Sequence, residues 1–469
     1  MNLNTNLQAS GVVTRIDGPL LFARRQVDVG LNESVEVTGG DGRRRLGRIA
    51  ALDEEFMTIE VLETTSGLAL DDTVIRFSGR PISFALGPDI LGRVFNGVGQ
   101  VLDGGPPIAA TRHLPIDGST LNPMHRNKPS DFIETGISGI DLLDSLVRGQ
   151  KLPVFSGGGL PHNRLALEIA QHARLPVKEG SLAQEEGFAI VFAGIGVPQD
   201  TADTFRNAME KSGALGHTVL FLNLASDSST QRLLAPRFAL TAAEYLAFVE
   251  GRHVLVILTD LTNYCESLRE VSASHGEIPS RKGYPGYMYS DLATLYERAG
   301  SIRGRKGTLT QIPILTMPAD DISHPIPDLT GYITEGQIVL DRNLDRQGIF
   351  PPIKVLPSLS RLMKDGIGEG FTHADHPALA NQLYAAYSQT SQVRLLSNVV
   401  GTDGLTETDR CYLAFGKGFE ERLLRQDRPR QLAQSMAIGW ELLSVLPVSE
   451  LSRLSDQQIQ RYIVRVTEK

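Results

Sequence analysis

The stretch Lys151–Ala170 (KLPVFSGGGLPHNRLALEIA) constrains the fold most, because it joins an apolar strand to a helix through a cluster of glycines. The strand is Leu152–Phe155, and the glycines are Gly157, Gly158 and Gly159. Phosphate-binding loops, G-x-x-x-x-G-K-[ST], have this order, and their backbone N–H groups cradle the phosphates. The stretch therefore predicts a strand–turn–helix unit of an α/β sheet with the shape of a phosphate loop.

The side chains that give such a loop its chemistry are missing. Counted from Gly157, the Gly, Lys and Ser/Thr positions of the motif hold His162, Asn163 and Arg164. Pro161 also removes a backbone N–H donor from the cradle. Two interpretations stay open at this point: a nucleotide site that has lost its catalytic atoms, or a glycine-rich turn that never bound a nucleotide.

Composition limits the class of protein. The chain has 469 residues, and a prior of roughly 150 residues per domain suggests about three domains. The hydrophobic fraction of 41% and the charged fraction of 21% are typical of globular proteins with sizeable cores. A net charge of -8 argues against general nucleic-acid binding.

Targeting and redox signals point to a cytoplasmic protein. No apolar run approaches the ~20 residues of a membrane-spanning helix, and the N-terminus lacks the regions of a signal peptide. The two cysteines, Cys265 and Cys411, are far apart, which fits a reducing compartment and gives no zinc-binding spacing. We therefore expect no metal site made by cysteines.

Two changes of periodicity predict three domains. Residues 1–80 contain short alternating segments between Gly/Asp turns, which are typical of a small β sandwich or barrel. Residues 81–374 alternate apolar strands with helices, which predicts an α/β domain with a parallel sheet. Residues 375–469 carry helical spacing and predict a helical bundle. The strands expected to be buried are Leu152–Phe155, Phe188–Ala193, Val219–Leu224, Val254–Thr259 and Ile312–Met317.

Asp260 ends one of these apolar runs. An acidic residue at this end of a strand near a phosphate loop commonly contacts magnesium-bound water, and it equally suits the N-cap of the helix that follows. The exit of another strand, Gly194–Val197, contains only glycine and apolar residues, so nothing there can orient an attacking water. Arg361 is a single arginine in a loop, and such residues are most often solvated surface charges.

Long runs of sequence carry a more specific signal. These runs are Thr135–Asn163, Leu240–Phe248, His253–Ala273, Gly283–Gly300, Thr310–Ile338 and Pro351–Met363. Together they resemble, over nearly the whole chain, the B subunits of V-type and A-type rotary ATPases. The short N-terminus resembles prokaryotic members of that family.

The resemblance implies an N-terminal β-barrel, a central P-loop-type nucleotide-binding domain and a C-terminal helical bundle. It implies a ring of three A and three B subunits around a rotor shaft, with a peripheral stalk and a membrane ring that moves protons or sodium ions. The A subunits hydrolyse or make ATP, and they hold most of the Mg²⁺ and of the ATP or ADP at the A–B interface. The B subunit is then non-catalytic, binds no nucleotide firmly by itself, and sits peripherally at the cytoplasmic face of the membrane.

The resemblance also assigns site residues. In the family, the arginine of the SLSR segment, Ser358–Arg361 here, reaches into the site of the A subunit, so Arg361 takes the role of a trans arginine finger, with Ser360 beside it at the interface. The chain's own degenerate loop (Gly157, Gly158, Gly159 and Asn163) and Asp260 become weak nucleotide contacts. Family members usually have Ser at the position of Gly158 and an acidic residue at that of Arg164, so this chain departs further from a binding loop.

Two other functions fit the same pattern. The first is a self-sufficient ATPase, such as an export motor or an RNA translocase, which Asn163 and Ile195 disfavour because neither can act on a phosphate or a water. The second is an assembly scaffold that contacts no nucleotide.

Overall fold

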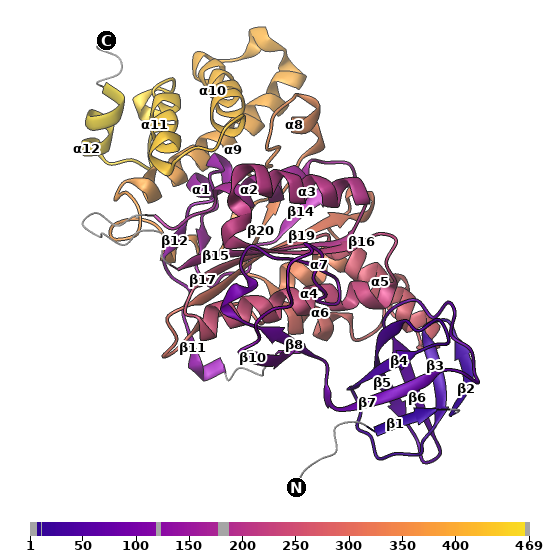
Figure 1. Ribbon diagram of the computed structural model, residues 1–469. Helices are drawn as coiled ribbons and strands as arrows, with labels where there is room; N and C mark the ends of the chain where they lie inside the picture. Colours follow the sequence, from indigo (N-terminus) through magenta and orange to yellow (C-terminus); the bar gives the residue numbers. More distant parts are fainter. Residues whose placement is uncertain (1–6, 11, 119–122, 177–186, 465–469) are drawn as a thin grey trace. The chain divides into compact units, whose positions relative to one another are not determined.

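The computed structural model (Figure 1) describes residues 7–10, 12–118, 123–176 and 187–464. The chain divides into two units. The first comprises Met1–Leu121, Val191–Tyr245 and Asp260–Arg298, and the second comprises Asn122–Ile190, Leu246–Thr259 and Ala299–Lys469. The domain limits at residues 80 and 374 stay predictions.

The N-terminal part of the first unit is a β-barrel (Figure 1), which decides between the sandwich and the barrel. Its antiparallel strands follow the order β1-β7-β4-β5-β6-β3-β2. They are β1 (Leu7–Ser10), β2 (Val13–Asp17), β3 (Leu20–Arg24), β4 (Glu33–Thr38), β5 (Arg44–Leu52), β6 (Phe56–Val61) and β7 (Val74–Pro81). Successive side chains of a strand point to opposite faces, so every second residue of β6 faces the core, and Met57, Ile59 and Val61 are buried.

The rest of the first unit is α/β. Strand β8 (Ser83–Leu86) pairs antiparallel with β10 (Arg112–Pro115), and β9 (Val94–Asn96) pairs parallel with β16 (Thr218–Leu224). Most of β15 (Phe188–Val197) also belongs here. The helices are α3 (Gln199–Ser212), α4 (Ser229–Glu244), α5 (Leu261–Ser274) and α6 (Met288–Tyr296), with 3₁₀ turns at Pro88–Ile90, Ala214–His217 and Arg281–Gly283. The π turn Tyr245–Val249 that follows α4 lies, after its first residue, in the second unit.

The second unit contains the strands that carry the candidate site. They follow the order β21-β20-β14-β19-β17, and all pair in parallel except β21, which is antiparallel to β20. These strands are β14 (Val154–Gly157), β17 (His253–Thr259), β19 (Thr308–Met317), β20 (Gly336–Val339) and β21 (Leu359–Ser360). Because β14, β17 and β19 are buried over almost their whole length, their sequences read as continuous apolar runs, as predicted.

Shorter elements of the second unit complete the sheet and its connections. The minor strands are β11 (Arg126–Asn127), β12 (Phe132–Ile133), β13 (Leu146–Val147) and β18 (Gly300–Ile302). The helices before residue 375 are α1 (Ser138–Leu143), α2 (His162–His172), α7 (Pro325–Ile333) and α8 (Arg342–Arg346), with 3₁₀ turns at Pro123–His125, Pro318–Asp320 and Met363–Asp365.

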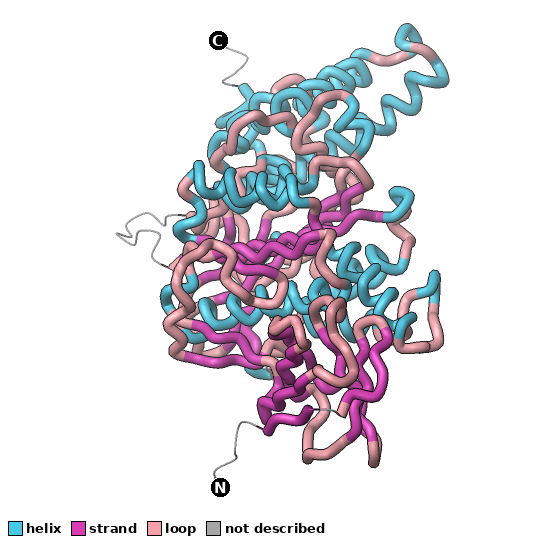
Figure 2. The backbone as a smooth tube through the Cα atoms, turned by 45° about the vertical axis from the view of Figure 1, so that its right-hand side comes forward, coloured by secondary structure: helices cyan, strands magenta, loops and turns pink. Residues whose placement is uncertain are grey.

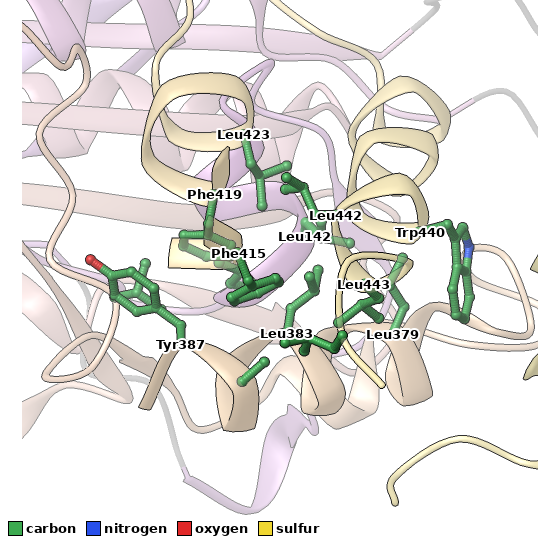
Figure 3. Packing of buried hydrophobic residues seen from close by; sticks show 14 of the residues in the cluster. Leu142, Leu379, Leu383, Tyr387, Phe415, Phe419, Leu423, Trp440, Leu442 and Leu443 are labelled. Carbon is green, nitrogen blue, oxygen red and sulfur yellow. The ribbon is translucent and has the colours of Figure 1, made fainter. Parts of the chain in front are cut away.

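The C-terminal segment is made of helices and loops (Figure 2). Its helices are α9 (His376–Val400), α10 (Glu407–Gly418, continued by a π turn at Phe419–Leu424), α11 (Leu432–Leu443) and α12 (Asp456–Gln458, continued at Ile459–Val464), with 3₁₀ turns at Thr402–Gly404 and Val448–Glu450. Their apolar side chains form one buried cluster, and Leu142 of α1 points into it beside Leu383 and Phe415 (Figure 3). The cluster therefore anchors α1, which leads directly to the candidate site.

The predicted fold class is confirmed: a β-barrel, a parallel α/β sheet and C-terminal helices are all present. The sequence analysis missed β1, the short strands between residues 81 and 133, and β13, β18, β20 and β21, because segments of two to four residues show too little periodicity. Within the ranges that the structure describes, none of the helices combines the length and the apolar character needed to cross a lipid bilayer.

Candidate functional site

The glycine turn joins β14 to α2, as its sequence predicts. Strand β14 ends at Gly157, the N–H of Leu160 donates to the Gly157 carbonyl over 3.1 Å, and α2 begins at His162. Gly159 has a φ of +79°, a left-handed conformation that glycine adopts without strain. The shape of a phosphate loop is therefore present.

Two of the side chains that replace the motif residues have partners inside the protein. His162 Nδ1 lies 3.1 Å from Ser156 Oγ, on the strand that leads into the turn. Asn163 Oδ1 accepts a hydrogen bond of 3.0 Å from Thr259 Oγ1, at the end of β17. The position that holds the phosphate lysine in an active loop is thus used to tie α2 to the sheet.

Arg164 occupies the position of the magnesium-binding hydroxyl. Its guanidinium carbon lies 3.7 Å from the centroid of the Phe350 ring, a cation–π contact. Magnesium requires oxygen ligands, which a guanidinium cannot supply. Pro161, at the N-cap of α2, offers neither a side-chain cap nor an N–H. The residues of this turn therefore do not fit Mg–ATP.

An ion pair between Arg342 and Asp320, two residues that follow β20 and β19 in the chain, supports the turn. Arg342 donates to Asp320 through Nε (2.9 Å) and to the Gly158 carbonyl through Nη2 (2.8 Å). A Cβ at Gly157 would lie 2.1 Å from Asp320 Oδ1, so a larger residue there would displace the Asp320 carboxylate. The hydrogen bond from Arg342 lowers the pKa of Asp320, and the resulting carboxylate beside the turn disfavours a phosphate.

Asp260 acts as the N-cap of α5. Its side chain accepts a hydrogen bond of 2.8 Å from the N–H of Thr262, and the residue is buried. A cap of this kind contributes roughly 1 kcal/mol to helix stability. The sequence allowed either an N-cap or a contact to magnesium-bound water, and the hydrogen bond to Thr262 shows the N-cap.

At the C-terminal end of β15, the side-chain amides of Asn263 and Asn223 bind the backbone. Asn263 Nδ2 donates to the carbonyls of Ile195 (2.9 Å) and Gly196 (3.2 Å), and the N–H of Gly196 donates to Asn223 Oδ1 over 2.9 Å. Ile195 itself is fully buried. The backbone polar groups of Ile195 and Gly196 are therefore occupied by hydrogen bonds within the protein. The loop Gly194–Val197 also carries no carboxylate that could activate a water.

The backbone around Arg361 is held from both sides. The Arg361 N–H donates to the Glu335 carbonyl over 3.0 Å, next to the β20–β21 pairing. Glu335 is fixed in turn by Lys151, whose Nζ lies 2.9 Å from Glu335 Oε1. Ser358 accepts the N–H of Val339 over 2.9 Å. The main chain that carries Arg361 therefore has little freedom.

Ser360 contributes to this anchoring through its side chain. The hydroxyl donates to the Ser145 carbonyl over 2.9 Å and accepts a hydrogen bond of 2.9 Å from Gln150 Nε2. Ser360 is buried, so its hydroxyl points into the protein. In this structure it positions its neighbour Arg361.

The Arg361 side chain behaves differently from its backbone. It is exposed, and its guanidinium makes no hydrogen bond or ion pair with any of the described residues. It lies at a cavity of about 650 Å³ in the second unit. The cavity is lined by apolar and polar side chains in equal number, and Asp144, Lys364 and Tyr384 are among the polar ones.

The structure separates the two groups of predicted site residues. Ser360 and Arg361 line the cavity together, whereas the described lining includes none of residues 157–164. Gly157, Gly158, Gly159 and Asn163 form the turn at the end of β14 in the same unit, and Asp260 belongs to the first unit.

The sequence analysis missed the residues that support Arg361. They are Asp144, Gln150, Glu335 and Gly336, which lie inside the long runs that carry the resemblance but were given no role of their own. Asp144 gave one available signal, a carboxylate inside the apolar stretch Leu142–Leu146. Among the described residues, no group of three or more His, Cys, Asp or Glu side chains is arranged to hold a metal ion.

Comparisons with known proteins agree with this architecture. Residues 13–79 match the β-barrel domain of the ATP synthase alpha/beta family, residues 136–360 match its nucleotide-binding domain, and residues 365–463 match the C-terminal domain of V and A type ATP synthase. A V-type ATP synthase beta chain from Halothermothrix orenii is 54% identical, with 96% of each chain covered. The solved structure of the ATP synthase subunit NeqB from Nanoarcheaum equitans superposes with a TM-score of 0.71 at 36% identity, covering 91% of this chain and 98% of that one. The chain therefore belongs to the ATP synthase alpha/beta family, in its V- and A-type branch, and is similar to the beta (B) chains of that branch.

Proposed function

We propose that this chain is the non-catalytic B subunit of a V/A-type rotary ATPase or ATP synthase, and that it supplies Arg361 to the catalytic site of a neighbouring A subunit. The 54% identity to a V-type ATP synthase beta chain supports the place in such a complex. The complex would couple ATP hydrolysis or synthesis to the transport of protons or sodium ions.

One observation carries the assignment of Arg361. Its backbone N–H is anchored, as are the side chains of Ser358 and Ser360, while its exposed guanidinium makes no hydrogen bond or ion pair with the described residues. A surface arginine that only adds solubility needs no such anchoring. A residue that acts on a neighbouring subunit needs both a fixed main chain and an unoccupied head group.

The chemistry suits an arginine. During phosphoryl transfer, charge spreads over the oxygens of the γ-phosphate, and a fixed planar cation with several N–H donors stabilises it. The guanidinium stays charged throughout the physiological pH range, so it needs no proton transfer.

The same proposal gives the other parts of the complex. ATP or ADP would bind at the A–B interface, with Mg²⁺ held mainly by the A subunit, because the turn at Gly157–Arg164 fits neither. Three A and three B subunits would alternate around the rotor shaft, with a peripheral stalk and an ion-translocating ring. The chain would then lie peripherally at the cytoplasmic face of the membrane.

The assignment as a non-catalytic subunit has a direct test. The purified chain is expected to show no ATP turnover, whereas turnover appears when it is mixed with its A subunit. Size-exclusion chromatography run on the same samples checks that the ring forms. Steady ATP hydrolysis by the chain alone would support a self-sufficient ATPase and contradict the proposal.

We expect the isolated chain to bind Mg–ATP weakly or not at all, because Arg164 and the Asp320 carboxylate replace or oppose the groups that bind Mg²⁺ and phosphate. Isothermal titration calorimetry measures this directly. The double variant Asn163→Lys, Arg164→Thr restores both motif side chains and should bind more tightly than the unmodified chain. Low-micromolar, magnesium-dependent binding by the unmodified chain would contradict the prediction.

A further inference from the structure

Asp144 lies directly after α1, where the chain turns toward β13. It is 4% exposed, and Leu142, Leu143 and Leu146 around it are buried. A carboxyl group in such surroundings requires an explanation, because burying an unpaired charge is strongly unfavourable. Packing of α1 against the C-terminal helices fixes its position (Figure 3).

The carboxyl group of Asp144 contacts the strand that carries Arg361. The backbone N–H of Ser360, the residue before Arg361, favours the charged form of this carboxyl and so lowers its pKa. Its Oδ2 atom is buried and has no hydrogen-bond partner among the described residues. Asp144 and Arg361 line the same cavity. A buried carboxyl with an unsatisfied oxygen and an arginine with an unoccupied head group therefore line one cavity.

We propose that Asp144 is a positioning residue for Arg361. While it is protonated, it needs no counter-ion and leaves the guanidinium free to reach the neighbouring subunit. Once it has lost its proton, it draws the guanidinium back into the cavity as its counter-ion. This inference rests on the proposed role of Arg361 and adds a pH-dependent control of that role.

The pKa of Asp144 decides at which pH the guanidinium of Arg361 is withdrawn. Burial raises its pKa to about 8, and the Ser360 N–H opposes this rise. Since the pKa of an acid is raised, the carboxyl is neutral below about pH 8 and ionised above it. An ionised Asp144 leaves a buried charge that an arginine can compensate. Alkaline pH therefore favours the withdrawn guanidinium.

The surrounding elements offer few other partners. Their titratable groups are Asp141 on α1, Arg361 after β21, Lys364 and Asp365 at Met363–Asp365, and His376 and Tyr384 on α9. His376 Nε2 lies 3.0 Å from the Leu142 carbonyl, and burial lowers its pKa to about 4, so it stays neutral.

Tyr384, Asp365 and Asp141 have hydrogen-bond or ion-pair partners of their own, whereas Lys364 could compete with Arg361 as the counter-ion of Asp144. Tyr384 donates to the Leu356 carbonyl over 3.0 Å, and Asp365 pairs with Lys128 at 2.7 Å. Burial raises the pKa of Asp141 to about 7, but the N–H groups of Thr135 and Gly136 satisfy its carboxylate. Lys364 is the second cation at the cavity, so the variants below include it.

The first measurement is the pH profile of ATP turnover by the assembled complex between pH 6 and 9.5. Turnover by the unmodified complex is expected to fall above pH 8, by about tenfold at pH 9 for a group with this pKa. The isosteric variant Asp144→Asn keeps an acceptor for the Ser360 N–H and should remove this fall. The control variant Asp365→Asn makes the same change on the neighbouring turn and should keep the unmodified profile.

The second measurement does not depend on turnover. Phenylglyoxal labelling of arginines, followed by mass spectrometry at pH 9, reports how accessible Arg361 is in the isolated chain. Arg361 should react several-fold faster in Asp144→Asn than in the unmodified chain, and Lys364→Met should leave the unmodified rate unchanged. Equal labelling and equal pH profiles in Asp144→Asn and the unmodified protein would overturn the inference, as would a Lys364→Met variant that slows the labelling of Arg361.

The two measurements separate this inference from the proposed function. If Arg361→Ala leaves turnover intact while the labelling difference persists, the trans role is wrong and the control of Arg361 by Asp144 stands. If Arg361→Ala abolishes turnover at every pH while Asp144→Asn changes neither readout, the trans role stands and the control is wrong.

Discussion

Replacing Arg361 by alanine is expected to lower ATP turnover of the assembled complex by on the order of 10³–10⁵, the range for removing an arginine that stabilises charge on a transferred phosphoryl group. The structure adds a reason to expect a specific effect. The Arg361 side chain makes no hydrogen bond or ion pair with the described residues, so its loss removes no such contact within the chain. Stability and ring assembly should therefore stay near the unmodified level.

Two further variants sharpen this result. Arg361→Lys keeps the charge but loses the planar fork of donors, so it should recover only part of the turnover. Arg303→Ala removes another exposed arginine, from the loop after β18, and should leave turnover unchanged. ATP hydrolysis is measured on complexes whose assembly has been checked by size. Near-normal turnover in Arg361→Ala would exclude the trans role, and loss of assembly would make Arg361 a structural residue.

The fold could be predicted where periodicity is long. The apolar runs that became β14, β15, β16, β17 and β19, and the glycine turn at Gly157–Gly159, are local patterns, and each appears at its predicted place within a few residues. The C-terminal bundle follows the same rule up to Leu443. Beyond it, helical spacing in the sequence runs over Ser449–Val466, whereas the helix of the structure runs only from Asp456 to Val464, and residues 465 and 466 lie outside the described residues. A capping box at Ser455 starts that helix.

The site was harder to predict because its supports are distant in sequence. Ser360 is held by Ser145 and Gln150, more than 200 residues earlier, and the glycine turn is braced by Arg342, 184 residues after Gly158. No local pattern encodes such contacts. Arg361 itself was identified only through the resemblance over Pro351–Met363, and its local sequence gave no reason to prefer it to other loop arginines. The degenerate chemistry of Asn163 and Arg164, in contrast, could be read directly from the motif.

The backbone support of Arg361 leads to a second strong prediction, at Gly336. This glycine has a φ of +139° and pairs with Ser360 across β20 and β21. A Cβ added to it would lie 2.1 Å from the Leu359 carbonyl oxygen, far inside van der Waals contact, and the neighbour is main chain that cannot rotate away. Gly336→Ala must therefore push β21, and with it Arg361, away from its position.

A misplacement of about 1 Å in a catalytic group can cost about 10²-fold in rate, so turnover of the Gly336→Ala complex is expected to fall by about that factor. Gly331→Ala is the matched control, because a Cβ there would meet its nearest atom, Gln337 Oε1, at an ordinary 3.5 Å. Thermal melting and size-exclusion chromatography separate displacement from unfolding: we expect Gly336→Ala to assemble with reduced turnover, and Gly331→Ala to match the unmodified complex. A Gly336→Ala ring with full turnover would show that the position of β21 does not control Arg361. The order of effects follows from the geometry, since deleting the guanidinium removes the charge entirely, whereas moving its strand only weakens the contact that it makes.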